Sequence, residues 1–468
     1  MRRLSLLDAG WLMIEAPERP MHVGGLQLFS LPDDAGPTFV ADLVANALEH
    51  TEIRPPFNQK LVRPHGLAGV YHWEPTAIDL TYHVRHLALP QPGRIRELLS
   101  LVSRNHQALL DRHRPLWESF LIEGLADGRI ALYTKTHHAM MDGVAAMKQV
   151  LKAFTPDPDR RDLPPPWALP ADSDGRAFPA TTAGGGEERG NSSPWHAVTR
   201  TLTGVADQVG GAVGAVTAMA QQVVASRLND AEVIPYQAPR SMLNQRLTGS
   251  RRFVAQSYDF ERIRAVSRAY RATVNDVVLA MCGGALRAYL LSHDALPDAP
   301  LIAMVPVSIR PADGGDEGNA ISMLLANLAT DLADPVDRLE RVKDSMDRGK
   351  ARLSRMSQTE LADYGILLMA PILAGELSRV SGWAPPLHNV VISNVPGPAE
   401  PLYWNGVRMD GLYPASLLTD GYALNITQTS YAGSMEFGIT ADRQALPRIQ
   451  RLIDHLEDEL AALEKAAP

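Results

Sequence analysis

Disulfide bonds within the chain are excluded by composition, because Cys282 is the only cysteine among the 468 residues. A reducing cytoplasm is therefore the expected compartment. A surplus of positive charge is also missing, since the formal net charge is -8, and this argues against nucleic acid as the main partner. Near the N-terminus, Asp8 and Glu15 come before any sustained apolar region, so no secretory signal peptide is expected.

The chain has no long apolar run either. The longest apolar window, residues 364–374, contains Pro371 and is bounded by Asp363 and Glu376, whereas a helix that crosses a bilayer needs roughly 20 apolar residues. We therefore expect no transmembrane helix. The window could line a tunnel for an apolar chain, dock on a lipid surface or form a helix of the core, and any contact with a membrane would be peripheral.

The most informative motif is the heptad 137–143, His-His-Ala-Met-Met-Asp-Gly. The segment 130–136 before it is rich in β-branched and aromatic residues that alternate in polarity, which predicts a strand. The segment 144–151 after it has the composition and apolar spacing of a helix. The sequence therefore places the heptad at a turn between a strand and a helix, where functional residues are common.

Two adjacent histidines on an extended segment point to opposite faces, so only one of them can enter a given cavity. A neutral imidazole near pH 7 suits the removal of a hydroxyl proton while an alcohol attacks an activated acyl group. A metal site is the main rival, but no third His or Cys lies nearby at ligand spacing, and we predict no metal. Two histidines bound to backbone carbonyls are a further alternative, although four fixed residues in seven should recur by chance only on the order of once in a thousand chains of this length.

Length and composition predict two or three domains, at roughly 150 residues each, and the 45% hydrophobic content can supply their cores. We expect an N-terminal lobe over 1–155 and a mobile linker rich in Pro and Gly over 156–194. An amphipathic connecting helix over 195–228 and a C-terminal lobe over 229–468 would follow.

Local patterns predict several elements within the lobes. We expect helices over 94–110, 274–290 and 446–465, the second of them started by Thr273 and Asn275. We expect strands over 301–307, 389–394, 424–431 and 434–440.

The sequence resembles the bacterial wax ester synthase/diacylglycerol acyltransferase family, within the superfamily of CoA-dependent acyltransferases and peptide-synthetase condensation domains. The superfamily shares His-His-x-x-x-Asp-Gly. Further blocks, in the family's order, carry the narrower resemblance across nearly the whole chain: Pro20-Met21-His22-Val23-Gly24, Arg114-Pro115-Leu116-Trp117-Glu118, Thr273-Val274-Asn275-Asp276-Val277, Val305-Pro306-Val307-Ser308, Asn389 to Pro398 and Ala423-Leu424-Asn425-Ile426-Thr427. The tract 156–194 matches no family pattern.

The resemblance implies an α/β fold of two related acyltransferase lobes, each with a mixed sheet and helices, and an active-site channel between them. It implies transfer of an acyl group from acyl-CoA to a long-chain alcohol or diacylglycerol in one ternary complex, with His138 as base, His137 as a supporting residue and no tightly bound cofactor. The expected partners are these substrates and the surface of a lipid droplet or membrane. The alternatives are a condensation-type amide-forming enzyme and a non-catalytic protein that binds lipids or coats droplets.

Asp142 and Gly143 complete the heptad, and we expect Asp142 to be structural. In related plant acyltransferases the matching Asp pairs with an Arg of the second lobe, for which Arg310 is the candidate here. The rival interpretation is a catalytic triad in which Asp142 orients His138.

Four further side chains have two interpretations each. Trp117 could shape the substrate pocket or belong to the core, and Asn275 could contact substrate or cap a helix. Asn394 could bind the thioester oxyanion or the pantetheine arm, or form a turn before Pro and Gly. Arg251 and Arg252 could meet the CoA phosphates or form a solvated basic pair.

Overall fold

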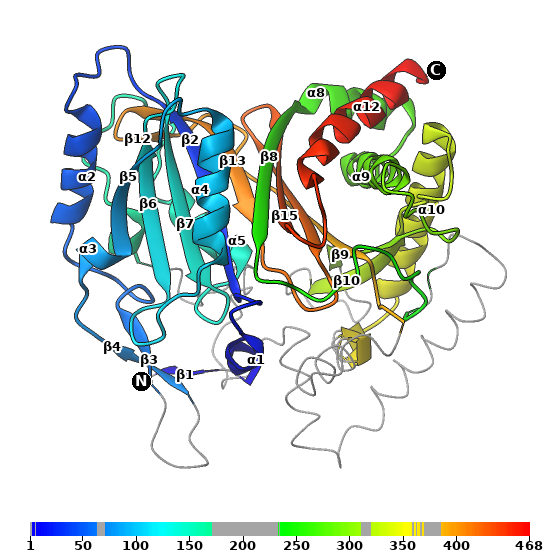
Figure 1. Ribbon diagram of the computed structural model, residues 1–468, viewed down its shortest axis with the longest axis horizontal. Helices are drawn as coiled ribbons and strands as arrows, with labels where there is room; N and C mark the ends of the chain where they lie inside the picture. Colours follow the sequence, from blue (N-terminus) through cyan, green and yellow to red (C-terminus); the bar gives the residue numbers. More distant parts are fainter. Residues whose placement is uncertain are drawn as a thin grey trace.

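Two six-stranded sheets stand side by side, and a three-stranded sheet lies at one end of the molecule (Figure 1). The computed structural model describes residues 2–4, 6–62, 71–170, 233, 235–309, 320–357, 360–361, 363–365, 367–368 and 385–468. Both large sheets are mixed and carry helices, which confirms the predicted α/β fold of two lobes.

The first large sheet has the order β12-β13-β2-β7-β6-β5. Its strands are β12 (Tyr403–Trp404), β13 (Val407–Ala415), β2 (His22–Ser30), β7 (Ile130–His137), β6 (Trp117–Glu123) and β5 (Val84–Ala88). The small sheet consists of β1 (Arg2–Arg3), β4 (His72–Pro75) and β3 (Gln59–Val62). The helical segments of this part are α1 (Leu6–Ile14), α2 (Phe39–Glu49), α3 (Leu80–His83), α4 (Ile95–Gln107), α5 (Gly143–Leu151) and the 3-10 turn η1 (Pro166–Ala168).

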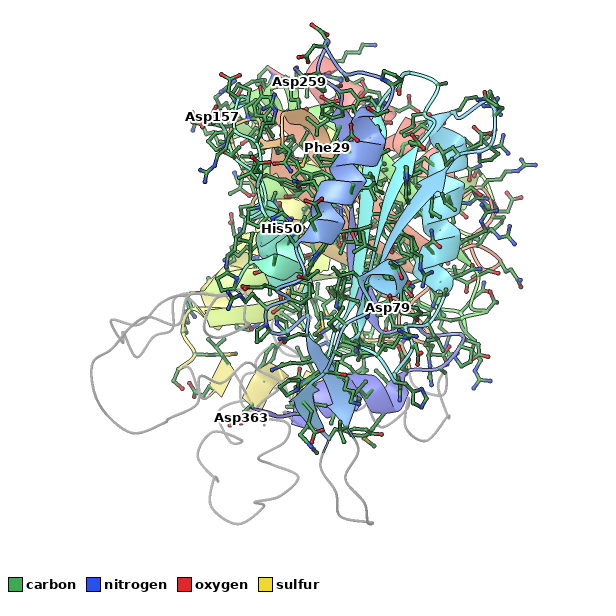
Figure 2. The ribbon with its side chains drawn as sticks, turned by 90° about the vertical axis from the view of Figure 1, so that its left-hand side faces the viewer. Phe29, His50, Asp79, Asp157, Asp259 and Asp363 are labelled. Carbon is green, nitrogen blue, oxygen red and sulfur yellow. The ribbon has the colours of Figure 1, made fainter. Side chains whose placement is uncertain are left out.

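Two layers of helices cover the first sheet. The apolar residues of α2 and α5 pack with Phe29 and Leu132 on one face, and Figure 2 shows α2 in front of this face, with His50 at its C-terminal end. On the other face α4 packs with Phe120 and Tyr133. The inner strands β2 and β7 are therefore covered on both sides, as their largely buried side chains require.

The second large sheet has the order β10-β9-β11-β14-β15-β8. Its strands are β10 (Ala320–Asn327), β9 (Ile302–Ile309), β11 (Val390–Val395), β14 (Leu424–Tyr431), β15 (Ser434–Asp442) and β8 (Arg251–Asp259). Its helices are α8 (Phe260–Ala269), α9 (Val274–Leu291), α10 (Pro335–Leu353), the 3-10 turn η2 (Ile449–Arg451) and α12 (Leu452–Lys465). The predicted strands of this half and helix 274–290 are confirmed, while the closing helix begins at Leu452 after η2 rather than at Leu446.

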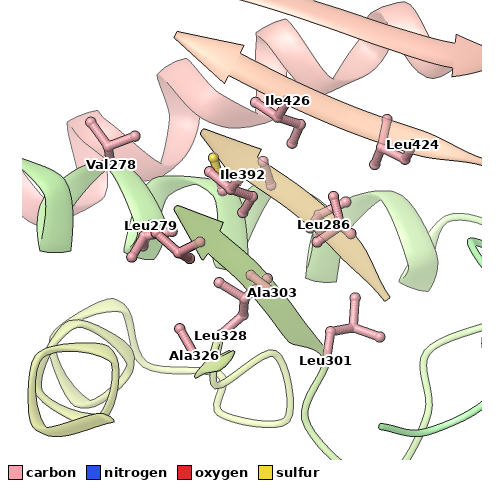
Figure 3. Close-up of a cluster of buried hydrophobic side chains, with 14 of the residues drawn as sticks. Val278, Leu279, Leu286, Leu301, Ala303, Ala326, Leu328, Ile392, Leu424 and Ile426 are labelled. Carbon is pink, nitrogen blue, oxygen red and sulfur yellow. The ribbon is translucent and has the colours of Figure 1, made fainter. Parts of the chain in front are cut away.

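Helix α9 forms the centre of the second core. Val278 and Leu286 of α9 pack against Ile392 of β11 and Ile426 of β14, as Figure 3 shows. By length and composition alone α9 could cross a membrane, but 72% of it is buried inside this core. A capping box between Thr273 and Asp276 starts the helix, so the predicted start at Thr273 is confirmed.

The two lobes meet at an edge of the second sheet. Helix α4 of the first lobe lies along β8, where the backbone N–H of Phe253 donates to Ser103 Oγ (2.8 Å). Close approach also depends on Gly438 of β15, because a Cβ there would lie 1.8 Å from the carbonyl oxygen of Pro414 on β13. The junction is therefore tightly packed and needs glycine at this point.

The structure differs from the predicted division of the chain in two places. Residues 403–415 belong to the first sheet, where β13 pairs with β2, although the prediction placed all of 229–468 in the second lobe. Residues 156–170, predicted as mobile linker, pack on the first lobe, and Trp167 is 3% exposed and stacks on Trp117. Both differences arise from contacts between residues far apart in the sequence. The pairing of β13 with β2 and the packing of residues 156–170 on the first lobe cannot be recognised from the local sequence. The remainder of the linker (171–194), the predicted helix 195–228 and most of the window 364–374 lie outside the described residues.

Candidate active site

The histidine heptad lies where β7 ends and α5 begins, as predicted. The backbone N–H of His138 donates to the carbonyl of Met21 (2.8 Å), and His137 is paired in register with His22 of β2. The chain then turns, because the N–H of Met140 donates back to the His137 carbonyl (2.9 Å). These backbone bonds fix the position from which each histidine side chain departs.

The His137 imidazole is fully buried and has a contact at each ring nitrogen. Its Nδ1 accepts from the backbone N–H of Ala139 (3.0 Å), so the proton of the neutral ring lies on Nε2. That nitrogen is 3.2 Å from Oε1 of Glu15. With both nitrogens directed into the protein, His137 has no free position for a substrate.

Glu15 is held in turn by Arg112 and the backbone. Its side chain is 3% exposed, and Arg112 Nη2 donates to its Oε2 (2.8 Å) while the Met21 N–H donates to its Oε1 (3.1 Å). Burial alone would raise the pKa of Glu15, but the hydrogen bonds and charges of His137 and Arg112 keep the pKa below its ordinary value of 4.5. The carboxylate is therefore ionised and orients His137.

Behind this network, Lys135 lies on the same face of β7 as His137. Its buried Nζ donates to the carbonyls of Asn105 (2.9 Å) and Ala108 (2.8 Å) and lies 3.2 Å from Glu118 Oε2. A cation at the last carbonyls of a helix is favourable, so Lys135 ties the heptad strand to the C-terminal end of α4.

His138 differs from His137 in both exposure and partners. Its side chain is only partly buried, and its ring lies 4.5 Å from the ring of Trp11, centroid to centroid. Neither ring nitrogen makes a hydrogen bond to another residue in the described part of the chain. Burial lowers the pKa of His138 below its ordinary value of 6.5, although the carboxylates of Asp142 and Asp8 oppose this effect. A neutral ring with accessible nitrogens can accept a proton from a substrate.

Asp142 caps the helix that follows the heptad. It is half-buried, and its Oδ1 accepts from the backbone N–H of Ala145 (2.8 Å), the usual role of Asp at this position. No hydrogen bond joins Asp142 to His138 in the described structure. Arg310 lies outside the described residues, so the Asp142–Arg310 pair stays a prediction.

Gly143 is exposed, and a Cβ there would come no closer than 3.9 Å to Val23, so packing alone does not require glycine at this position.

Trp117 is fully buried in the first lobe. Its Nε1 donates to the Phe57 carbonyl (2.9 Å), and its ring stacks on His83 and Trp167. Asn275 lies in the first turn of α9, half-buried. No ring contact or hydrogen bond joins either residue to His138 in the described ranges. Trp117 has the core setting of its structural interpretation, whereas the cap of α9 is formed by Thr273 and Asp276 and not by Asn275.

Asn394 lies near the end of β11, half-buried and in register with Gln428 of β14. Side chains in register on neighbouring parallel strands share a face of the sheet. Gln428 is fully buried, and neither atom of its amide has a hydrogen-bond partner among the residues described. Asn394 and Gln428 therefore form a polar pair on one face of the second sheet. The sequence itself had singled out Asn394 but not Gln428.

Arg251 is neither solvated nor free for a ligand. It is 4% exposed, its Nη1 lies 3.5 Å from Asp442 Oδ2, and its Nη2 donates to the carbonyl of Glu18 (2.7 Å). The predicted solvated pair is therefore wrong for Arg251, because β8 turns this side chain toward the other lobe. Arg252 points to the opposite face.

Sequence reasoning missed Glu15, Arg112 and Trp11 as neighbours of the heptad. They come from three separate segments, and Glu15 and Arg112 are 97 positions apart. Only the nearby block beginning at Pro20 pointed to this region. Within the ranges that the structure describes, no three His, Cys, Asp or Glu side chains come together as metal ligands.

Comparisons with known proteins identify the family of the chain. Residues 4–278 match the model of the wax ester synthase/diacylglycerol acyltransferase catalytic domain, and residues 317–464 match the C-terminal domain of the same family. An O-acyltransferase of Acinetobacter baylyi is 45% identical over 99% of this chain and 97% of its own length. A probable diacylglycerol O-acyltransferase of Mycobacterium tuberculosis is 43% identical over 98% of each chain.

Solved structures show the same relationship. The wax ester synthase/diacylglycerol acyltransferase of Marinobacter aquaeolei superposes with a TM-score of 0.76 and 41% identity, covering 99% of both chains. A condensation domain of the CDA synthetase shares the fold, with a TM-score of 0.55 at 16% identity over 100% of this chain and 97% of that one. Together with the two-lobed fold and the histidine heptad, these matches place the chain in the class of CoA-dependent acyltransferases. Within that class, the chain belongs to the wax ester synthase/diacylglycerol acyltransferase family.

Proposed function

We propose that this acyltransferase moves a long-chain acyl group from acyl-CoA to the hydroxyl of a fatty alcohol or of diacylglycerol, with His138 as the general base. The observation that carries the proposal is the division between the two histidines. His137 has both ring nitrogens directed to protein atoms, whereas His138 is partly exposed, held toward the neutral form and, among the described residues, without a hydrogen bond from its ring to another residue.

In the proposed reaction the acceptor hydroxyl donates a hydrogen bond to His138. As the alcohol oxygen attacks the thioester carbonyl, its proton passes to the imidazole and negative charge develops on the carbonyl oxygen. Collapse of this intermediate breaks the carbon–sulfur bond, and the CoA thiolate takes the proton back from His138. The products are an ester and free CoA, and no acyl-enzyme forms. Binding both substrates together supplies much of the rate through proximity.

Acyl-CoA is the co-substrate of this family, and we propose that no tightly bound cofactor is needed. The acceptors are insoluble in water, so the proposal also includes reversible, peripheral binding of a cytoplasmic enzyme to droplet or membrane surfaces. Flotation with phospholipid-coated triolein droplets tests this part. An active enzyme absent from the floating fraction at low salt would contradict it.

A direct assay tests the reaction. Purified protein is incubated with palmitoyl-CoA and either hexadecanol or dioleoylglycerol, and free CoA and the ester product are followed together. We expect both to appear in equal amounts and only when an acceptor is present. Release of CoA without ester would indicate thioester hydrolysis, and formation of neither product would overturn the proposal.

A further inference from the structure

Three arginines gather where α4 of the first lobe meets β8 of the second. Ser103 Oγ and Gln107 Oε1 of α4 accept from the backbone N–H groups of Phe253 (2.8 Å) and Arg251 (3.2 Å). Arg96 lies seven residues before Ser103, so it lies on the same side of α4. It is exposed, in the first turn of this helix.

Arg252 and Arg443 belong to the same face of the adjoining strands. In the ladder between β15 and β8, Ala441 pairs with Arg252, and Arg443 follows two residues after Ala441. The ladder continues, because the N–H of Arg443 donates to the carbonyl of Ser250 (2.9 Å). Residues two apart on a strand share a face, so Arg252 and Arg443 are diagonal neighbours, roughly 7–8 Å apart.

No acidic side chain neutralises this group. Within the described ranges, none of the guanidinium groups of Arg96, Arg252 and Arg443 makes an ion pair or a side-chain hydrogen bond. Burial lowers the pKa of Arg252, the neighbouring Arg443 and Arg96 lower it further, and no carboxylate counteracts them. In a chain with a net charge of -8, three like charges held together are stabilised when an anion binds between them.

Arg251 and Arg252 are neighbours on β8 but differ in their partners. Arg251 alternates with Arg252 along β8 and is buried against Asp442, whose carboxylate also accepts from Thr248. Arg251 therefore has a structural ion pair, whereas Arg252 has none with the residues that the structure describes.

We propose that Arg96, Arg252 and Arg443 bind the phosphate groups of the acyl-CoA substrate. Guanidinium groups bind phosphate oxygens through paired, charge-assisted hydrogen bonds. Arg96 belongs to the first lobe and Arg252 and Arg443 to the second, so a phosphorylated group held by all three would bridge the two lobes. The inference rests on the proposed function, which supplies acyl-CoA as the donor.

The experiment compares two donors in the Arg252→Gln/Arg443→Gln variant. Palmitoyl-CoA carries phosphates, whereas the palmitoyl thioester of N-acetylcysteamine has none, and hexadecanol is the acceptor for both. We expect KM for palmitoyl-CoA to rise about 10-fold or more, with kcat little changed and kinetics with the short thioester unchanged. Adenosine 3′,5′-bisphosphate should inhibit the wild type competitively and the variant much more weakly.

The matched control is Arg264→Gln/Arg268→Gln, which removes two exposed positive charges from α8 of the same lobe. It should leave both KM values unchanged, and all three proteins should have the same melting temperature. Equal KM values for palmitoyl-CoA in wild type and variant would overturn the inference. So would an unchanged KM together with lost binding to vesicles of phosphatidylcholine and phosphatidylglycerol, which would assign the arginines to a lipid headgroup. A wild type inactive with both donors would instead contradict the proposed function.

Discussion

His137 and Glu15 face each other inside the first lobe, with Nε2 of the imidazole 3.2 Å from Oε1 of the carboxylate. The same buried carboxylate is paired with the partly exposed Arg112, and it lies beside the ring that precedes His138. Within the heptad, His137 therefore has a structural role at the turn, whereas the ring of His138 remains available to a substrate.

The Glu15–His137 contact predicts a loss of stability when the carboxylate is removed. Glu15→Ala removes the buried carboxylate that accepts from Arg112 and from the Met21 N–H and lies beside His137 Nε2. Because Arg112 is partly exposed and also donates to the Leu12 carbonyl, we expect the free energy of unfolding to fall by about 1 to 3 kcal/mol. Glu15→Gln keeps an acceptor and should cost less. Urea unfolding measures both, with the exposed Glu18→Ala as control. A Glu15→Ala protein as stable as that control would contradict the assignment.

Substitution of His138 and substitution of His137 should have different effects on turnover and stability. His138→Ala should lower turnover by about 10²- to 10⁴-fold without loss of fold, because a general base is removed. His137→Ala should lower stability, and activity only as far as the turn is displaced. Initial rates with palmitoyl-CoA and hexadecanol, beside circular dichroism spectra, separate the two effects. Greater catalytic damage from His137→Ala, in a folded protein, would assign the base to His137.

The lowered pKa of His138 predicts the acid side of the pH profile. The neutral ring is the active form, so activity should be lost only when the pH falls through a pKa below the ordinary value of 6.5. We expect kcat/KM, which reports the ionisation of the free enzyme, to be constant from pH 8 down to pH 7 and to decline below 6.5. An acid limb above pH 7 would mean that burial does not control this histidine.

Asp142 should act through the helix it caps. Asp142→Ala removes the acceptor of the Ala145 N–H and should cost about 1 kcal/mol of stability, the usual value of an N-cap. A larger loss, about 3 to 5 kcal/mol, is expected if Asp142 also pairs with Arg310. Asp142→Asn keeps a cap and should keep most of the turnover. A folded Asp142→Asn enzyme slowed about 10⁴-fold would support the catalytic triad instead.

Glu436 of β15 predicts a dependence of stability on pH. Burial raises its pKa from 4.5 to about 7, although hydrogen bonds with Ser257 and Tyr413 oppose the shift. The folded protein therefore retains a proton that the unfolded chain releases above pH 4.5. Stability from this group is complete below pH 4.5 and is lost as the pH rises through about 7, by up to about 3 kcal/mol.

The Glu436→Gln variant isolates this effect, because the amide keeps the size of the side chain and cannot ionise. Its melting temperature should change less than that of the wild type between pH 5 and pH 8, and the variant should be the more stable protein at pH 8. Identical pH dependence in the two proteins would show that Glu436 ionises normally in the folded state.

The limits of helices and strands were predictable from the sequence where they depend on a few consecutive residues. Strand 424–431 and helix 274–290 were predicted within a residue of their observed limits, since alternation and a capping threonine act over a few positions. The closing helix was predicted six residues too early, because a 3-10 turn over 449–451 precedes it.

The sequence by itself determined the α/β class, the family and the chemistry of the heptad, because periodicity and motif identity are properties of contiguous residues. Only the tertiary structure decided that 403–415 complete the first sheet, that Glu15 lies beside His137 Nε2, and that Arg251 pairs with Asp442 while Arg252 has no ion pair among the described residues. Each of these depends on partners far apart in the chain, such as Arg251 and Asp442 at a separation of 191 residues. Burial and charge pairing at such distances are settled only when the whole chain packs, and no local pattern encodes them.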